Sequence, residues 1–253
     1  MYAPERQQEI LRLARESGRV DVLSLAEEFQ VTAETIRRDL KILDRSGLVR
    51  RVHGGAIPAG RLDFEPDVTE RESTAADEKD RIAQAALGEL PADGSVILDA
   101  GTTVARLAAA IPVDSGLTVV THGLPVAARL ADHPGIALHL VGGRVRHRTR
   151  AAVDAWALRA YAEIRADVLF LATNGFSPDD GLTTPDLAEA AVKRAAIAAA
   201  RRVVLLADSA KAGQEHFARF GSFADVDLLI TDSGLSPENA AAIKAAGTEV
   251  LLT

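Results

Sequence analysis

The sequence of 253 residues contains no cysteine, and aromatic residues make up only 4% of it. Without cysteine the chain can form neither a disulfide bond nor a thiolate metal site, which suits a reducing compartment. No apolar run approaches the roughly 18 residues of a membrane span, and charge begins at Glu5 in place of a signal-peptide core. We therefore expect a cytoplasmic protein.

Close pairs of potential metal ligands are also missing. The histidines are His53, His122, His133, His139, His147 and His216. None of them has the short paired spacing that metal sites use. We interpret each as a surface residue or as the partner in one hydrogen bond, and we expect neither a metal nor another cofactor.

The charge of the chain is unevenly distributed. The formal net charge is −7, yet residues 1–57 contain ten Lys or Arg and nine Asp or Glu, a net charge of +1. Positive charge concentrates between Arg37 and Arg61. A local positive potential attracts phosphate whatever the overall charge of the protein. The length suggests two domains, one of them small.

A basic amphipathic helix is predicted over residues 33–46. Thr32 is a favourable N-cap residue, and Gly47 is expected to end the helix in a left-handed conformation. One face is apolar, at Ile36, Leu40 and Leu43. The opposite face is basic and carries Arg37, Arg38, Lys41 and Arg45. A basic face is often simply solvated, so this helix alone does not decide the function.

Two shorter helical patterns come before it, and a strand and turn come after it. The apolar positions are Ile10, Leu13 and Ala14 in the first pattern, and Val22, Leu25, Ala26 and Phe29 in the second. Three short helices with a basic third one are typical of a helix-turn-helix unit. Residues 48–52 predict a strand, and Gly54-Gly55 predicts the turn of a basic wing. Together these features favour DNA binding.

The rest of the chain predicts an α/β domain. Residues 58–75 show no apolar periodicity and are predicted to be a linker, which leaves a winged helix-turn-helix domain over 1–57 and an α/β domain over 76–253. Strands are predicted over 96–98, 117–120, 137–141, 168–172, 203–207, 228–230 and 250–252, and helices near 77–90, 103–110, 124–132, 155–165, 185–200 and 237–246. This alternation indicates a largely parallel sheet covered by helices.

Polar motifs follow several of these strands, at the edge where α/β proteins bind ligands. Asp99-Ala100-Gly101-Thr102-Thr103 joins a strand to a helix, and such a turn can hold phosphate at free backbone amides. It can equally be an ordinary capped turn. The motifs at 173–175, 181–185 and 208–211 reach the same edge, as do Glu189 and Lys193, which in isolation resemble a surface ion pair. Their convergence favours a pocket for a small phosphorylated polyol.

Two runs in the first domain, 32–40 (TAETIRRDL) and 49–56 (VRRVHGGA), resemble the signature of the DeoR family of bacterial transcriptional repressors. The resemblance continues, in order, through Glu70-Arg71, Glu78-Lys79, 99–103, Gly142-Gly143, 181–184, 189–193 and 208–211. It implies an N-terminal winged helix that binds operator DNA. It also implies a C-terminal domain similar to ribose-5-phosphate isomerase, whose sugar-phosphate effector usually releases the repressor from DNA.

The resemblance also assigns residues. The DNA-binding residues are expected to be Thr32, Thr35, Arg37, Arg38, Lys41, Arg50, Arg51 and His53. The effector-binding residues are expected to be Asp99, Gly101, Thr102, Thr103, Asp154, Asn174, Thr184, Glu189, Lys193 and Lys211.

The chain departs from the common family pattern at two places. Many members have Thr-Asn at the position of Thr121-His122, and a glycine near Val153-Asp154. Both departures concern the sugar side of the expected pocket. Residues 153–156 (VDAW), together with 173–175 (TNG), look more like an actinobacterial branch that includes regulators of fructose phosphotransferase operons.

These observations predict a repressor of a sugar-catabolism or sugar-uptake operon that is relieved by a phosphorylated sugar. Because one winged helix gives only a small interface, a homodimer or homotetramer is expected. The alternative is a sugar-phosphate isomerase-like enzyme with a DNA-binding appendage. Its acid and base would come from Asp99, Asp154, Glu189 and Asp208.

Overall fold

The chain divides into two compact units, Met1–Phe64 and Glu65–Thr253, which are described separately. The computed structural model describes residues 2–45, 48–58, 65 and 67–253. The predicted helix cap at Gly47, the last predicted helical residue Ser46, and residues 59–64 and 66 of the expected linker lie outside the described residues.

The first unit is a winged helix-turn-helix, as predicted. Its helices are α1 (Ala3–Ser17), α2 (Val22–Glu28) and α3 (Ala33–Arg45). Its small antiparallel sheet has the order β1-β3-β2, with β1 (Val20–Asp21), β3 (Gly55–Pro58) and β2 (Val49–Val52). The predicted apolar stripes pack together in its core, where Ile10, Leu25, Ile36, Leu40 and Leu43 are all buried.

Glycine is required at the two wing positions, 54 and 55, for different structural reasons. Gly54 adopts a φ of 76°, a left-handed conformation that favours glycine in a tight turn. At Gly55 a β-carbon would lie 1.9 Å from the carbonyl oxygen of Val20, so that no larger residue allows β3 to approach β1. The Gly54-Gly55 pair therefore closes the hairpin and seats it on β1.

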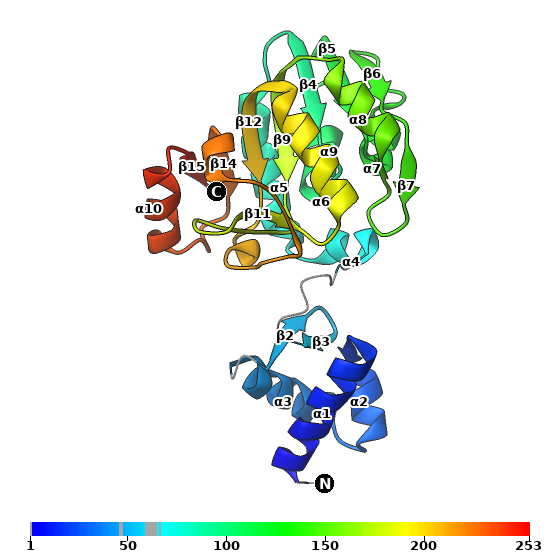
Figure 1. Ribbon diagram of the computed structural model, residues 1–253, viewed down its shortest axis with the longest axis vertical. Helices are drawn as coiled ribbons and strands as arrows, with labels where there is room; N and C mark the ends of the chain where they lie inside the picture. Colours follow the sequence, from blue (N-terminus) through cyan, green and yellow to red (C-terminus); the bar gives the residue numbers. More distant parts are fainter. Residues whose placement is uncertain (1, 46–47, 59–64, 66) are drawn as a thin grey trace. The chain divides into compact units, whose positions relative to one another are not determined.

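The second unit is built on a seven-stranded parallel sheet with helices packed against it (Figure 1). The strand order is β15-β14-β12-β9-β4-β5-β6. The strands are β4 (Gly94–Leu98), β5 (Leu117–Thr121), β6 (Ile136–Leu140), β9 (Ala166–Ala172), β12 (Ala200–Leu206), β14 (Leu228–Thr231) and β15 (Glu249–Leu252). Each coincides with a predicted strand to within a few residues, and the predicted parallel sheet is confirmed.

Helices cover both faces of this sheet because its strands are apolar on both sides. In β4, for example, Val96 and Leu98 pack on one face and Ile97 on the other. One face is covered by α5 (Ala76–Ala86), α6 (Thr102–Ala110) and α7 (Leu124–Leu130), and the other by α8 (Ala155–Ala162), α9 (Leu187–Ala198) and α10 (Pro237–Ala245). All six helices were predicted.

Several smaller elements were not predicted. A hairpin pairs β7 (Arg144–Arg146) with β8 (Ala151–Val153), and a second small sheet has the order β10-β11-β13. Its strands are β10 (Gly175–Ser177), β11 (Gly181–Thr184) and β13 (Ala218–Gly221), and the 3-10 turns are η1 (Leu87–Glu89), η2 (Ser209–Lys211) and η3 (Phe223–Asp225). Residues 181–184 thus form a strand that the sequence did not predict, and α9 begins only at Leu187.

Part of the expected linker belongs to the second unit. Glu65 is buried, and a short helix, α4 (Val68–Ser73), begins at the N-cap residue Asp67, whose side chain accepts a hydrogen bond from the Glu70 backbone amide. Val68 is also buried. The missing periodicity has a physical reason: this segment is held by one apolar side chain and by polar contacts, which leave no repeating apolar stripe.

Candidate functional site

The first unit exposes a basic surface on α3 and the wing. Arg37, Arg38 and Lys41 on α3 are exposed, as are Arg51 and His53 on the wing. Arg50 is partly buried, and burial lowers its pKa. These six predicted residues therefore lie on α3 or on the wing hairpin, and five of them are open to solvent.

The two predicted threonines begin α3. The Thr35 backbone amide donates to the Thr32 hydroxyl at 3.2 Å, and the two hydroxyls lie 2.9 Å apart. Thr32 is therefore the N-cap residue that the sequence predicted. A hydroxyl that accepts from an amide can still donate its own proton, so the cap leaves Thr32 able to contact a base or a phosphate.

A buried ion pair fixes the orientation of α3 on α1. Asp39, on the inner side of α3, accepts from Arg6 Nε at 2.6 Å and from Gln7 Nε2 at 2.9 Å. The side chains of Arg6 and Asp39 are 8% and 3% exposed. The sequence did not predict this pair, because Arg6 and Asp39 are 33 residues apart and no local pattern links them.

In the second unit, the predicted polar motifs gather where the chain order of the sheet reverses. From β4 the chain runs outward through β5 and β6, and then returns to the other side of β4 with β9. Ligands bind at this kind of switch point in open α/β sheets, beyond the carboxyl ends of the strands. Asp99 follows β4 directly, and Thr173 follows β9.

Asp99 is the centre of a buried cluster at this point. It accepts from Lys193 Nζ at 2.5 Å and from the backbone amides of Ala172 and Ala100 at 2.8 Å each. Burial alone raises the pKa of Asp99, but Lys193 and His122 outweigh it, and the net shift is downward. Asp99 is therefore ionised, and it ties together the ends of the two central strands.

His122 is buried in the same cluster and has two polar contacts, so its interpretation as a surface residue or as the partner in one hydrogen bond was wrong. Its Nε2 lies 3.3 Å from Asp99 Oδ1, and its Nδ1 lies 2.8 Å from the hydroxyl of Tyr161. Burial lowers the pKa of His122 and raises that of Tyr161, so the imidazole is neutral and the phenol protonated. This favours a proton on Nε2 and a hydrogen bond from Tyr161 to Nδ1. The one available signal was the departure from the family pattern at Thr121-His122.

Glu189 and Lys193 do not form the surface pair that their spacing suggested. Both are buried on α9, and each has its own partner. Lys193 pairs with Asp99, while Glu189 accepts from Arg146 Nη1 at 2.7 Å and from the hydroxyl of Thr149. One helix therefore contributes a cation and a carboxylate to the site, one turn apart.

A cationic cluster lies beside this site. We define it as Arg71 on α4, Lys79 on α5, and Lys211 on η2, with Asp208 as its carboxylate. Lys79 donates to the carbonyl oxygens of Arg71 at 2.5 Å and Thr74 at 2.6 Å. Burial, and then the charge of Lys211, lower the pKa of Lys79 to about 7. Burial also lowers the pKa of Lys211.

The guanidinium of Arg71 is incompletely satisfied. Within the described part of the chain, its Nε and Nη2 are buried and have no hydrogen-bond partner. Buried donors nearly always have partners, so a pair of open ones on one guanidinium indicates a place for an acceptor. Sequence reasoning noted Arg71 and Lys79 only as part of the family resemblance.

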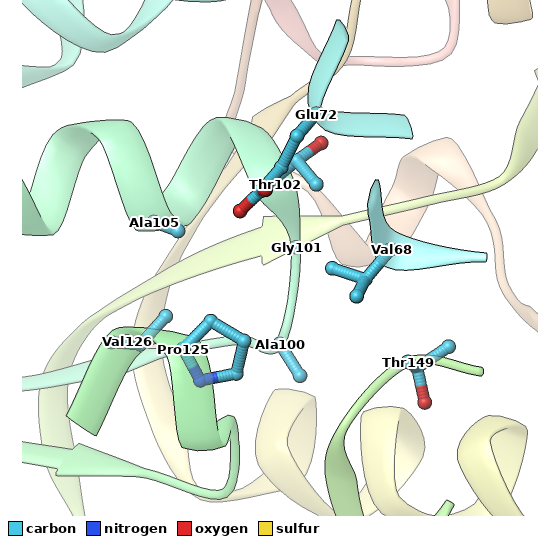
Figure 2. Close-up of a pocket in the computed structure, with 9 residues that line it drawn as sticks. All are labelled: Val68, Glu72, Ala100, Gly101, Thr102, Ala105, Pro125, Val126 and Thr149. Carbon is cyan, nitrogen blue, oxygen red and sulfur yellow. The ribbon is translucent and has the colours of Figure 1, made fainter. Parts of the chain in front are cut away.

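A small pocket lies at the turn between β4 and α6. Gly101 and Thr102 line it, together with Val68 and Glu72 of α4, and Pro125 and Val126 of α7 contribute its apolar wall. Figure 2 shows Val68 and Glu72 projecting from α4 toward this turn. A β-carbon on Gly101 would lie 2.5 Å from Cβ of Ala172, so the glycine is already required by the packing of α6 on β9.

The remaining predicted residues have other partners or positions in the second unit. Thr103 is buried in the first turn of α6, and the hydroxyl of Thr184 donates to the side-chain oxygen of Asn174 at 2.9 Å. Lys211 lies 3.6 Å from Asp208. Asp154 pairs with Arg144 at 2.6 Å on the more exposed side of the β7–β8 hairpin.

Asp154 explains one departure from the family pattern. Its φ of 75° and ψ of −166° fall in a region that is almost restricted to glycine. Many family members carry a glycine near this position. In this chain the aspartate adopts the glycine conformation, and its carboxylate pairs with Arg144.

The described residues include neither a candidate metal site nor a helix that could span a membrane. No group of three or more His, Asp or Glu residues there is arranged to hold a metal ion. Likewise, no helix in that part of the chain is both long enough and apolar enough to cross a bilayer.

Comparison with known families gives matches in both units. The model for the DeoR C terminal sensor domain matches residues 74–233, and the model for the DeoR-like helix-turn-helix domain matches residues 6–59. Together the two matches cover most of the chain and both of its units.

Two curated relatives match nearly end to end. The HTH-type transcriptional regulator GlpR of Haloferax volcanii is 36% identical, over 99% of this chain and 98% of its own length. The glycerol-3-phosphate regulon repressor of Escherichia coli is 32% identical, over 92% of each chain. Among solved structures, ribose 5 phosphate isomerase A from Neisseria gonorrhoeae is 17% identical, covers 58% of this chain and 57% of its own, and has a TM-score of 0.38. At that distance the isomerase's chemistry supports no conclusion about this chain.

Proposed function

The chain belongs to the DeoR family of transcriptional regulators, and we propose that it is a repressor that leaves its operator when a phosphorylated polyol binds beside α6. The observation that carries the proposal is the open guanidinium of Arg71 within the cationic cluster. The DNA-binding half of the proposal rests on the exposed basic residues of α3 and the wing.

The charge balance beside α6 favours an anion. Arg71, Lys79 and Lys211, with Lys193 next to them, are accompanied by the carboxylates of Asp99 and Asp208, while Glu72 in the lining of the pocket has its own cation, Arg129, at 3.4 Å. The first turn of α6 adds free backbone amides and the positive end of the helix dipole. A phosphate dianion would accept from the open atoms of Arg71 and offset the excess positive charge.

The charge balance around Arg146 is the opposite. Its guanidinium lies within 3.3 Å of three carboxylates, those of Glu65, Asp186 and Glu189. Of these carboxylates, Asp186 and Glu189, at the start of α9, have spare lone pairs that can accept hydrogen bonds from sugar hydroxyls, whereas Glu65 is buried against Arg146. A ligand with a phosphate at one end and hydroxyl groups at the other would fit both surroundings. This supports a phosphorylated polyol over a free sugar or a bare anion.

The proposal is tested by titration of the full chain with its own upstream promoter DNA. A thermal-shift screen with glycerol 3-phosphate, fructose 1-phosphate and other sugar phosphates identifies a ligand of the folded state, because binding raises stability. That ligand is expected to weaken DNA binding. Absence of binding to this DNA at low ionic strength, with and without these compounds, would contradict the proposal. Turnover of a sugar phosphate without DNA binding would favour the isomerase-like enzyme instead.

Two substitutions are expected to separate the DNA site from the effector site. Arg38→Ala removes a cation from α3, so we expect weaker DNA binding, a salt dependence reduced by about one charge, and unchanged effector binding. Lys211→Ala removes a cation from the cationic cluster, so the repressor should stay on DNA when effector is added. Fluorescence anisotropy and calorimetry measure the two affinities. Damage to both functions by either variant, without unfolding, would contradict the two-site proposal.

Effector binding is expected to weaken as the pH rises above about 7. Lys79 has a pKa of about 7 in the ligand-free protein, because of burial and of its cationic neighbours. A phosphate nearby favours the charged form and raises this pKa, so binding takes up a proton at higher pH. The effector Kd should then rise by up to about tenfold per pH unit above 7.

Calorimetry in two buffers of different ionisation heat measures that proton uptake directly. Lys79→Arg stays charged at all these pH values, so the proton uptake that comes from Lys79 should disappear. Lys244→Arg, at an exposed position on α10, should show the same proton uptake as the wild type. A wild-type Kd that stays constant from pH 7.5 to 9 would place the anion away from Lys79.

A homodimer or homotetramer is part of the proposal. A single winged helix covers only a short stretch of DNA, so tight and specific binding calls for at least two units on repeated half-sites.

A further inference from the structure

Glu65 is a buried carboxylate at the start of the second unit, and it is held by one guanidinium. Arg146 Nη2 lies 2.8 Å from Glu65 Oε2, and Arg146 Nη1 lies 3.3 Å from Glu65 Oε1. The side chain of Glu65 is 2% exposed. Such two-point pairs between arginine and carboxylate are strong and define the geometry of both partners.

The same guanidinium also holds α9. Arg146 Nη1 lies 2.7 Å from Glu189 Oε1, and Arg146 Nε lies 3.2 Å from Asp186 Oδ2. The hydroxyl of Thr149, on the same hairpin as Arg146, donates to Glu189 as well. Arg146 therefore pairs both with Glu65, at the start of the second unit, and with Asp186 and Glu189, at the proposed effector site.

The backbone around Glu65 is fixed by the hairpin too. Arg148 Nη1 donates to the Glu65 carbonyl oxygen at 2.5 Å, and the Val68 backbone amide donates to the Arg148 carbonyl oxygen at 2.9 Å. We call Arg146 and Arg148, together with Glu65 and Val68, to which they bind, the hairpin clamp. Along the sequence, this clamp is where the second unit begins after the DNA-binding unit.

We propose that Arg146 and Glu65 act as positioning residues that transmit occupation of the effector site at Glu189 to the segment leading to the DNA-binding unit. This inference rests on the proposed function, because it describes how the effector of that site is sensed.

The physical reason is the sharing of a single charge. When ligand hydroxyls donate to Glu189, its hydrogen bond with Arg146 weakens. The Arg146 guanidinium then bonds more strongly to Glu65 and Asp186. Inside a protein such pairs are screened less than in water, so a small redistribution changes the free energy of the Glu65 contact. A ligand that makes different contacts with two arrangements of the clamp shifts the balance between them.

A purely structural role makes a different prediction. If the Glu65–Arg146 pair only attaches the segment to the second unit, removing the charge of Glu65 should change stability but leave the coupling between effector and DNA intact. The decisive quantity is therefore the coupling factor, which is the operator Kd with saturating effector divided by the operator Kd without it.

The test compares the wild-type chain with Glu65→Gln, which keeps the size of the side chain, and with Glu65→Asp, which keeps its charge. Glu249→Gln, at an exposed position on β15, is the matched control. The probes are the upstream promoter duplex, and glycerol 3-phosphate or fructose 1-phosphate, whichever stabilises the wild type. Anisotropy gives the operator Kd, calorimetry gives the effector Kd, and hydrogen exchange follows residues 65–74.

In Glu65→Gln we expect both separate affinities to stay within about threefold of wild type, while the coupling factor falls from the usual 5–150-fold range to within about twofold of 1. Effector should change the hydrogen exchange of residues 65–74 in the wild type and in Glu249→Gln, but not in Glu65→Gln. Glu65→Asp should keep part of the coupling.

A coupled wild type with an equally coupled Glu65→Gln would overturn the inference and leave the proposed function standing. A wild type that binds effector with no change in its operator affinity would contradict the proposed function itself, and would overturn the inference with it, since no coupling would exist for Glu65 to carry.

Discussion

Asp39→Ala is expected to destabilise the DNA-binding unit by about 3–5 kcal/mol and so to weaken operator binding. Asp39 is buried, and its removal takes away the carboxylate to which both Arg6 and Gln7 donate. Breaking one side of a buried ion pair costs about 3–5 kcal/mol. A unit of this size has a stability of about 3–10 kcal/mol, so much of it would be lost.

Operator affinity, far-UV circular dichroism and hydrogen exchange of residues 2–58 measure this effect. Because only the folded fraction binds, the apparent operator affinity falls in proportion to the fraction that remains folded. Effector binding by the second unit should persist and serves as an internal control. Glu16→Ala removes an exposed carboxylate from the Arg12 pair on α1 and should cost less than about 1 kcal/mol. Normal melting of Asp39→Ala would show that α3 does not depend on this pair.

Lys193→Met is expected to cause the largest loss of stability in the second unit. The substitution keeps the side-chain length but leaves Asp99 buried and ionised without its ammonium partner. Loss of one partner from a buried pair costs about 3–5 kcal/mol. For a unit of 189 residues this corresponds to a fall in Tm of about 6–20 °C.

The pH dependence distinguishes this mechanism from simple loss of packing. In the wild type the pKa of Asp99 is lowered, so its contribution to stability is present at neutral pH and is lost as the pH falls through its titration. In Lys193→Met burial dominates and raises that pKa, so the folded state binds the proton and gains stability as the pH falls. The gap between the two proteins should therefore narrow toward pH 4. Lys244→Met, at an exposed position, should melt like the wild type at every pH. A gap that stays constant with pH would mean that Asp99 is not the group left uncompensated.

The sequence predicted the parts of the fold that rest on apolar periodicity. Ile36, Leu40 and Leu43 repeat at helical spacing, and all are buried in the first unit. Val168 to Ala172 form a continuous apolar run, as expected for a strand covered on both faces, and they lie in β9. The edge at which the polar motifs meet followed from the parallel order of the strands.

Periodicity could not reveal the elements that depend on pairing between distant residues. Residues 181–184 are too few to show a repeat, and they form a strand only because β10 and β13 flank them. Glu65 is charged and has no apolar stripe around it, so its burial depends on Arg146, 81 residues away. His122 likewise becomes central only through Tyr161, 39 residues away.

The site residues show the same division. The motifs at 99–103 and the pair Glu189 and Lys193 were identified from the sequence, but their partners were not. Lys193 binds a carboxylate 94 residues away, and Glu189 binds a guanidinium that the sequence reading did not single out. Spacing along one helix predicted that the two would lie on the same face; it could not show that each has a separate partner.

Because Lys193 and Glu189 lie four residues apart on α9, their separation is set by the rigid rise of one helix, about 6 Å. The helix therefore holds an ammonium group and a carboxylate at a fixed separation, which limits the length of a ligand that can reach both. On the proposed assignment, a ligand that has its phosphate beside Lys193 and its hydroxyl groups at Glu189 would have to match this spacing.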